Sequence, residues 1–142
     1  MSDTHNVLSL DVGGRRIGVA LASLEARLPS PLLTIDRSKV QDVFGHITSL
    51  IQEYAAETVV IGLPRGMDGQ ETAQTASARE FARQLEAACN AAIVLQDEAA
   101  TSLLAEDELK ESGKPYEKAD IDKLAATYIL RDWLTGQKEH SL

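Results

Sequence analysis

The sequence predicts an α/β domain with a five-stranded mixed β-sheet and helices on its faces. Three extended stretches follow one another in residues 6–35. After them, two short apolar runs at 58–61 and 92–95 are separated by helical patterns. Short turns join antiparallel strands, whereas helices between strands allow crossovers to a parallel sheet. The 142 residues fit one domain, with an ordered core over residues 6–135 and a short polar tail after 136.

The first two strands are predicted to form a hairpin within residues 6–23. An apolar run leads to Gly13 and Gly14, and beyond this turn every second residue of the next run is large and apolar. A third strand at 32–35 follows two prolines, whose missing N–H groups suit the entrance of a strand. Three antiparallel strands in series are therefore expected.

Four helices are predicted in the rest of the chain. Ser38 and Gln41 have the spacing of a capping box, so the first helix is expected to begin there. The second follows the turn-rich segment 63–69, and the third ends at Gly113 and Pro115. The last helix is expected to face the core with one apolar stripe. This stripe consists of Ile121, Leu124, Ala125, Tyr128 and Ile129.

Composition is that of an ordinary globular protein, with 44% apolar and 25% charged residues. The single Cys89 cannot form an internal disulfide, which fits a reducing cytoplasm. Neither a membrane-spanning stretch nor a signal peptide is recognisable, so we expect a cytoplasmic protein with no membrane partner. The net charge of −8 argues against a broad grip on phosphates, so basic residues that contact nucleic acid must act locally.

Asp11 is the first acidic residue with a position that suggests chemistry. It interrupts an apolar run and falls on the same strand face as Val7 and Ser9. The missing side chain of Gly13 is expected to leave room beside it for a phosphate or a metal ion. A turn aspartate that caps its own backbone is an equally good interpretation of the position.

Two pairs of acids offer further metal ligands, and spacing alone does not choose within either pair. Asp97 and Glu98 follow the fifth strand, at the edge where α/β sheets bind ligands. Asp120 and Asp122 open the last helix, and Asp122 borders its buried face. For both pairs, acids that stabilise a helix start are the alternative. Three carboxylates from separate elements would provide oxygen ligands for Mg²⁺ or Mn²⁺.

Four basic residues are candidates for contact with substrate phosphates. Arg15 and Arg16 follow the first turn, and Arg65 lies in the loop after the fourth strand. Lys123 follows Asp122 directly and is a further candidate. For each of them taken singly, a solvated surface charge is the more common situation.

Four motifs together resemble the YqgF nuclease family, in the family's order and over nearly the whole chain. They are LDVGGRRIGVA at 10–20, VIGLP at 60–64 with MDG at 67–69, the acid pair 97–98 with 101–102, and the pair 121–122 with 125–126 and 129–130. The resemblance implies one RNase H-like domain over residues 1–142. It also implies a cytoplasmic bacterial nuclease that matures the 5′ end of pre-16S rRNA in ribosome biogenesis, or a Holliday junction resolvase-like DNA nuclease.

Carried over by position, the resemblance selects Asp11, Glu98 and Asp122 as catalytic acids and metal ligands. It implies a hydrolase of the two-metal-ion type, with Asp11 bridging the ions. Arg16 matches the basic residue that family members place before Ile-Gly. The chain departs from the family at Ala99-Ala100, where members usually carry Arg-Leu.

Two other functions stay open at this point. A noncatalytic nucleic-acid-binding domain of the same fold is favoured by the net acidity and by Ala99, and opposed by the presence of all three acids. An actin-like ATP-binding domain is suggested by the first hairpin alone, and 142 residues leave little room for its second lobe. The expected partner is pre-rRNA or branched DNA. A monomer would favour RNA and a homodimer the junction, because resolvases cut symmetric junctions as dimers.

Overall fold

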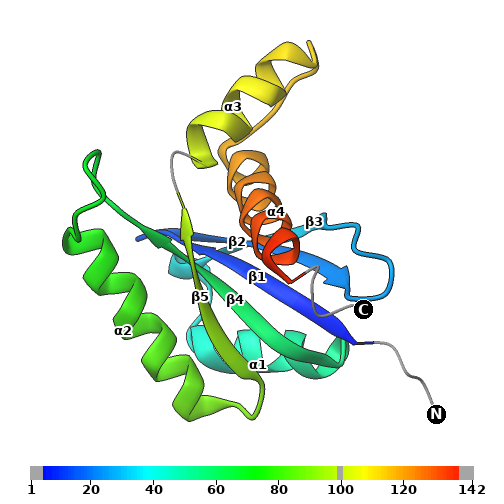
Figure 1. Cartoon of the computed structure of the whole chain (residues 1–142), viewed down its shortest axis with the longest axis vertical. Helices are drawn as coiled ribbons and strands as arrows, with labels where there is room; N and C mark the ends of the chain where they lie inside the picture. Colours follow the sequence, from blue (N-terminus) through cyan, green and yellow to red (C-terminus); the bar gives the residue numbers. More distant parts are fainter. Residues whose placement is uncertain (1–4, 99–100, 138–142) are drawn as a thin grey trace.

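The computed structural model describes residues 5–98 and 101–137, and five strands within them form one mixed sheet (Figure 1). The strand order is β3-β2-β1-β4-β5. Their bounds are Asn6–Val12 for β1, Arg16–Ser23 for β2, Ser30–Asp36 for β3, Ala56–Pro64 for β4 and Ala92–Glu98 for β5. The first three strands pair antiparallel, and β4 runs parallel to both β1 and β5. The predicted mixed sheet is confirmed.

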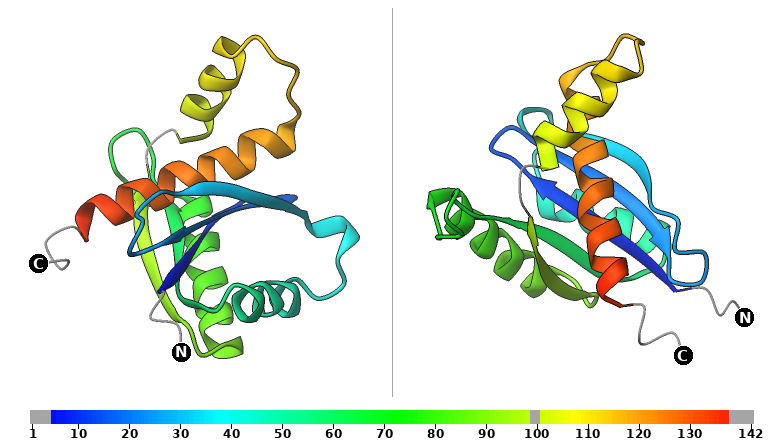
Figure 2. Two further views of the ribbon diagram at one scale, coloured as in Figure 1. Left: turned by 90° about the vertical axis from the view of Figure 1, so that its right-hand side faces the viewer. Right: turned by 45° about the horizontal axis from the view of Figure 1, so that its top comes forward.

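Helices cover both faces of this sheet. Their bounds are Val43–Glu53 for α1, Ala73–Ala88 for α2, Thr101–Glu111 for α3 and Lys118–Gly136 for α4. Helices α1 and α2 pack on one face and α4 crosses the other, as the left view of Figure 2 shows. Helix α3 packs on α4 through Ala105, which is fully buried beside Tyr128. Within the described residues, no helix is both long and apolar enough to cross a membrane.

Alternation along β1 sorts its side chains between the two faces. Leu8 and Leu10 are fully buried in the cluster beneath α1 and α2, whereas Val7 belongs to the cluster beneath α4. The hydroxyl of Ser9 donates to the carbonyl oxygen of Ala126 in α4 at 2.6 Å, which satisfies a buried polar group. The period of two therefore carries the next odd-numbered residue of β1 to the α4 side, as predicted.

Small residues on β2 let α4 approach the sheet closely. Gly18 and Ala20 face the helix, and a Cβ atom at Gly18 would lie 1.9 Å from the carbonyl oxygen of Asp122. The hydroxyl of Thr34 in β3 donates to the carbonyl oxygen of Ala119 at 2.7 Å. The first two turns of α4 are thereby held against β2 and β3, and this contact determines where Asp122 lies.

The start of α1 was predicted wrongly. Ser38 lies in a single 3-10 turn, η1 (Arg37–Lys39), which is capped by Asp36. Helix α1 begins at Val43, and the Asp42 carboxylate accepts from the Gly45 N–H at 3.0 Å. The capping signal therefore occurs twice in this segment. Only the second cap is followed directly by residues that pack into the core, and burial of an apolar face stabilises a helix more than its cap does.

The ends of β4 and β5 also differ from the prediction. The apolar runs that predicted these strands end at residues 61 and 95, yet the paired register continues for three more residues, to Pro64 in β4 and Glu98 in β5. Asp97 and Glu98 are therefore strand residues. Their interpretation as acids at a helix start is wrong.

Candidate active site

The three predicted acids line a single groove at one edge of the sheet. Asp11 lies near the end of β1, Glu98 is the last residue of β5, and Asp122 lies in the first turns of α4. Parallel strands β1, β4 and β5 end at this edge, and α4 begins there. The groove has a volume of about 1070 Å³. Asp11 is thus brought to one site with two acids that lie 87 and 111 positions further along the sequence.

Negative charge is crowded around Asp11. Burial, together with the neighbouring carboxylates of Glu98 and Asp122, raises the pKa of Asp11 from 3.8 to about 7. A buried carboxyl next to two others is stable only when it is protonated or when a cation lies close by. The site therefore has the electrostatic character of a cation-binding site.

Glycine in β4 makes room for Glu98. A Cβ atom at Gly62 would lie 3.1 Å from the Glu98 carboxyl group and 2.5 Å from the Ile129 side chain. The strand next to β5 therefore lets one carboxylate and one core side chain of α4 approach its backbone. Gly62 enters the sequence prediction only as part of the VIGLP motif, so its place beneath Glu98 was missed.

Asp122 is paired with an arginine of β2. The Nε atom of Arg16 donates to Oδ2 of Asp122 at 2.5 Å, and the two side chains are 32% and 16% exposed. In the structure without substrate, the partner of Arg16 is therefore a carboxylate. Its predicted contact with a substrate phosphate stays a prediction. Within the described residues, no three His, Cys, Asp or Glu side chains already surround one point as a closed metal cage would.

The acids next to Glu98 and Asp122 have other partners. Asp97 accepts from the Nε atom of Arg65 at 3.2 Å. Asp120 accepts from the backbone N–H of Glu117 at 2.9 Å and lies 3.4 Å from the ammonium of Lys123. The Glu117 N–H lowers the pKa of Asp120. Asp97 and Asp120 therefore act in local structure, and neither lines the groove.

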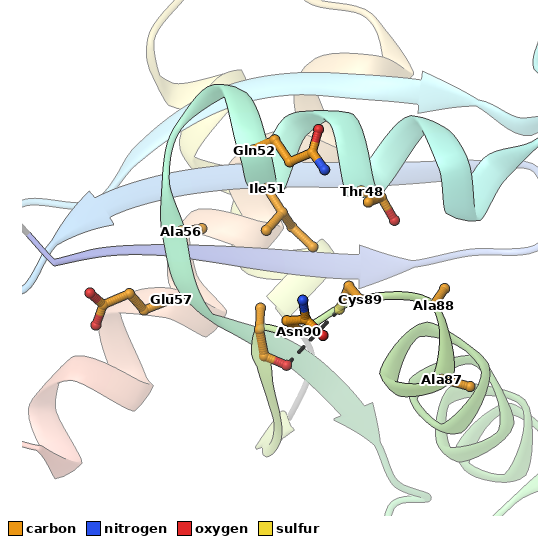
Figure 3. A pocket seen from close by; sticks show the side chains of 10 residues that line it. Thr48, Ile51, Gln52, Ala56, Glu57, Ala87, Ala88, Cys89 and Asn90 are labelled. Atoms are coloured by element: carbon orange, nitrogen blue, oxygen red, sulfur yellow. Dashed lines mark hydrogen bonds between the residues drawn. The ribbon is translucent and has the colours of Figure 1, made fainter.

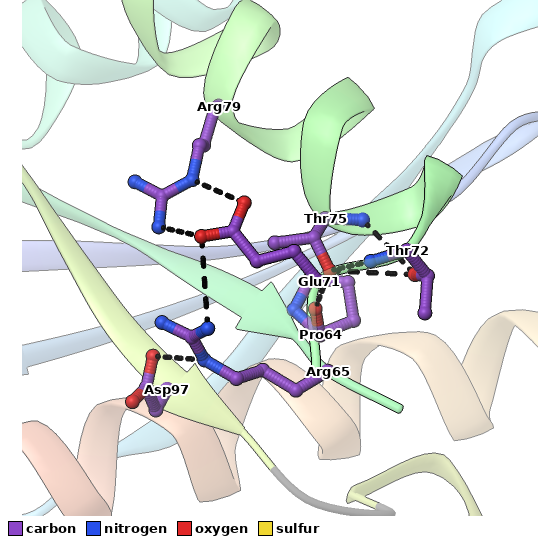
Figure 4. A network of polar contacts seen from close by, with 7 residues as sticks. All are labelled: Pro64, Arg65, Glu71, Thr72, Thr75, Arg79 and Asp97. Carbon is purple, nitrogen blue, oxygen red and sulfur yellow. Dashed lines mark hydrogen bonds and ion pairs between the residues drawn. The ribbon is translucent and has the colours of Figure 1, made fainter. Parts of the chain in front are cut away.

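Arg65 belongs to a network that joins the ends of β4 and β5 to the start of α2 (Figure 4). Besides Asp97, it contacts the Glu71 carboxylate at 3.7 Å, which in turn accepts from Arg79 at 2.7 Å. The buried Thr75 hydroxyl donates to the carbonyl oxygen of the last residue of β4. Arg65 lines the groove, where its charge is shared with two carboxylates, and its contact with a substrate phosphate stays a prediction.

The other two predicted cations, Arg15 and Lys123, are neighbours of lining residues but do not line the groove themselves. Arg15 contacts Asp36 at 3.7 Å, and neither Arg15 nor Lys123 is part of the groove lining. Sequence reasoning missed Arg37, which does line it. The predicted strand directions could have identified it. Because β2 runs antiparallel to β1 and β3 antiparallel to β2, β3 runs in the same direction as β1. A residue directly after β3 therefore emerges at the same edge as Asp11.

Gly13 is required by the hairpin itself. A Cβ atom there would lie 2.8 Å from the carbonyl oxygen of Arg16, and the Gly13 N–H donates to that oxygen at 2.9 Å. Gly13 also lines the groove beside Asp11, and the predicted room for a phosphate or metal ion there stays a prediction. Ala99-Ala100, where the chain departs from the family pattern, lies outside the described residues.

A second hollow of about 570 Å³ lies at the opposite end of β4, between the last turns of α1 and α2 (Figure 3). Among the residues that the structure describes, Glu57 is the single charged one in its lining. The Cys89 thiol lies 4.0 Å from the carbonyl oxygen of Ala91. Its lining therefore lacks the crowded charges that mark the groove.

Comparison with known proteins assigns the family. A family model described as RuvX, Holliday junction resolvase, matches residues 5–136. The chain belongs to this family. RuvX and YqgF are names for the same family, so the resemblance drawn from four motifs is confirmed. Membership in the RuvX family makes the chain a nucleic-acid-binding hydrolase of phosphodiester bonds and decides against the actin-like alternative.

Relatives in the RuvX family are similar over most of their length. A protein of Chloroflexus aurantiacus named "Putative pre-16S rRNA nuclease" is 39% identical over 136 residues, covering 94% of this chain and 89% of the relative. One of the same name from Methylobacillus flagellatus is 39% identical over 132 residues, covering 92% of this chain and 90% of that one.

Solved structures confirm the RNase H-like fold. Thermus thermophilus RuvC in complex with a Holliday junction substrate has a TM-score of 0.57 at 13% identity, covering 93% of this chain and 95% of that one. A fowlpox virus resolvase in complex with Holliday junction DNA has a TM-score of 0.56 at 13% identity, covering 94% and 99%. At these identities the likeness concerns the fold.

Proposed function

We propose that this chain is a metal-dependent endonuclease that cleaves a phosphodiester of an rRNA precursor, with Asp11, Glu98 and Asp122 as its catalytic and metal-binding acids. The observation that carries the proposal is the crowding of three carboxylates in one groove, where burial and two neighbouring charges raise the pKa of Asp11 to about 7. Such a cluster destabilises the metal-free fold, so its presence is best explained by a cation that it binds.

The donor set fits Mg²⁺ or Mn²⁺. Carboxylate oxygens are the ligands of these hard cations, and the described groove lining contains neither His nor Cys. When bound, divalent ions supply a water of lowered pKa and positive charge for the phosphate oxygens. Fold relatives typically use divalent metals, while the choice of ion is part of our proposal. Arg16 contacts only the Oδ2 atom of Asp122, so the other carboxylate oxygen can serve as the ligand while this contact is kept.

The remaining groups of the groove orient the substrate. Arg16 and Arg65 both line the groove and are both held by carboxylates in the free protein. An incoming phosphate offers each guanidinium a second anionic partner, and planar guanidinium groups bind phosphate oxygens in pairs. We assign to these two arginines the task of holding the scissile phosphate over Asp11.

The substrate is proposed from the relatives. Those about 39% identical bear the name of a pre-16S rRNA nuclease, and they match this chain over nearly its whole length. A second candidate is a four-way DNA junction, which the description of the family model favours. The two candidates share the same acids and differ in the shape of the nucleic acid that must reach them.

Cleavage of both substrates side by side tests the proposal. Purified protein is incubated with an rRNA-precursor fragment or a four-way DNA junction, in Mg²⁺, Mn²⁺ or EDTA, with Asp11→Asn as control. We expect cutting of the RNA that needs the metal and is lost in the variant. Faster cleavage of the DNA junction than of the RNA would instead support the resolvase function. Absence of cutting of either substrate by folded protein would contradict the nuclease and favour a binding domain.

A further inference from the structure

Three arginines line the groove, and they differ in their partners. Arg16 pairs with Asp122, and Arg65 pairs with two carboxylates. Arg37 forms no ion pair with any carboxylate in the part of the chain that the structure describes. Its Nη1 atom donates to the carbonyl oxygen of Gly13 at 2.8 Å, and its guanidinium carbon lies 5.6 Å from the centre of the Phe81 ring. Arg37 is thus a fixed positive charge without an anionic partner.

Besides the acids, the groove is lined by Arg37 and by the exposed side of α2, and these two together are called its second arm. This side carries neutral hydrogen-bonding groups, Gln74, Ser77 and Gln84. The one acid of α2 in the groove lining is Glu80, and Arg83 contacts it and offsets its charge. The first turn of α2 contains no acidic residue, and Glu71, which precedes the N-cap, is paired with Arg65 and Arg79. This arm of the groove therefore favours an anion with hydrogen-bonding groups over an apolar ligand.

We propose that this arm binds the phosphodiester backbone of the substrate strand next to the scissile phosphate, with Arg37 as the phosphate contact. The proposal rests on the nuclease function given above and extends it to a strand path. Gly13 lies two residues beyond Asp11, about 7 Å of extended chain. Arg37 is hydrogen-bonded to the carbonyl oxygen of Gly13, so its guanidinium lies near Asp11. It can therefore contact a phosphate close to the scissile one. The stacked ring and the backbone bond fix the guanidinium before the strand arrives, which reduces the entropy lost on binding.

Binding without cleavage isolates this contact. In the Asp11→Asn background, anisotropy of a labelled rRNA-precursor fragment is measured at several salt concentrations, with and without Arg37→Gln. We expect about tenfold weaker binding and a salt slope of log K that is smaller by about 1. Arg37→Lys keeps the charge and should keep the slope, which separates loss of the contact from damage to the turn.

Arg131→Gln is the matched control. Arg131 lies on α4 outside the groove, with its guanidinium 4.6 Å from the centre of the Tyr128 ring, so the same charge and the same kind of ring contact are removed. Its affinity and salt slope should equal those of the parent. Equal losses in Arg131→Gln and Arg37→Gln would mean a general charge effect and would overturn the subsite.

Neutral methylphosphonates placed singly along the strand locate the contacted phosphate. We expect that a methylphosphonate at one position near the scissile bond weakens binding to the parent protein. The same strand should bind the Arg37→Gln variant as well as the unmodified strand does. If no position shows this pattern, or if Arg37→Gln binds like the parent, the subsite is wrong while cleavage by the wild-type protein still supports the nuclease. Protein that neither cleaves nor binds nucleic acid contradicts both proposals.

Discussion

The two ends of β4 both border a hollow, and they differ in how charge is arranged there. At its carboxyl end, Asp11, Glu98 and Asp122 share one groove, and the pKa of Asp11 is raised to about 7. At the other end, the described residues that line the hollow beside Cys89 are neutral, with the single exception of Glu57. The presence of a hollow therefore does not identify the functional site in this protein. The repulsion between crowded carboxylates does identify it.

The largest expected effect is on the stability of the metal-free protein. The folded state keeps the Asp11 proton up to about pH 7, whereas the unfolded chain releases it near the ordinary 3.8. The wild type therefore loses stability as the pH rises between these values. Asp11→Asn is neutral throughout and should raise the free energy of unfolding at pH 8 by up to about 4 kcal/mol.

Urea unfolding in EDTA from pH 4 to pH 8 measures this difference. The two proteins should converge towards pH 4 and separate as the pH rises. At the other end of the strand, Glu57→Gln should change the free energy of unfolding by less than about 0.5 kcal/mol at every pH. A variant Asp11→Asn that is less stable than the wild type at pH 8 would contradict the repulsion on which the comparison depends.

The next effect concerns the close approach of α4. In Gly18→Ala the added methyl group would lie 1.9 Å from the carbonyl oxygen of Asp122, so the start of the helix must move. We expect destabilisation of about 1–3 kcal/mol and a fall in cleavage rate of about 100-fold. Gly14→Ala is the control at the same edge, because a Cβ atom there meets nothing within 4 Å. Unchanged cleavage by Gly18→Ala would show that the position of Asp122 is not critical.

A smaller effect is expected at Arg16. Removal of its guanidinium by Arg16→Ala leaves Asp122 without its 2.5 Å partner and removes one phosphate contact. We expect a fall in cleavage rate of about tenfold and weaker substrate binding. Arg15→Ala, which removes an exposed neighbour outside the groove, should stay within about twofold. Full rate and binding in Arg16→Ala would remove the arginine from the mechanism.

The smallest effect is expected at the second hollow, at the amino end of β4. Cys89→Ala alters the second hollow and should leave the cleavage rate within about twofold, because nothing there contacts the acids. A tenfold loss in a folded variant would show that the hollow is coupled to the active site. Cleavage rate together with the thermal midpoint distinguishes such coupling from a loss of folded protein.

Much of the fold could be predicted from the sequence, because period and turn residues report on it directly. The alternation that places Val7 and Ser9 on one face also places Asp11 there, and the structure agrees. The choice of Glu98 over Asp97 needed the family resemblance. Local spacing does not reveal that Asp97 has a distant partner in Arg65, since that partner comes from the end of another strand.

Contacts between distant segments explain what the sequence did not reveal. A Cβ atom at Gly13 would meet the backbone of its own turn, which no pattern of residue types shows. The alternating small residues of β2, by contrast, contained a signal for close packing of a helix, and Gly18 could have been read in this way. Arg37 could have been found from the strand directions, as the end of β3 returns to the edge of Asp11.

The most direct test of the central claim compares each site acid with a neighbouring acid that has a structural partner. Metal-dependent cleavage is measured for Asp11→Asn, Glu98→Gln and Asp122→Asn against Asp97→Asn and Asp120→Asn. We predict that each of the first three loses at least about 1000-fold in rate, and that the last two stay within about tenfold. Cleavage by any of the first three at the wild-type rate, or equal losses in both groups, would contradict the assignment of the site.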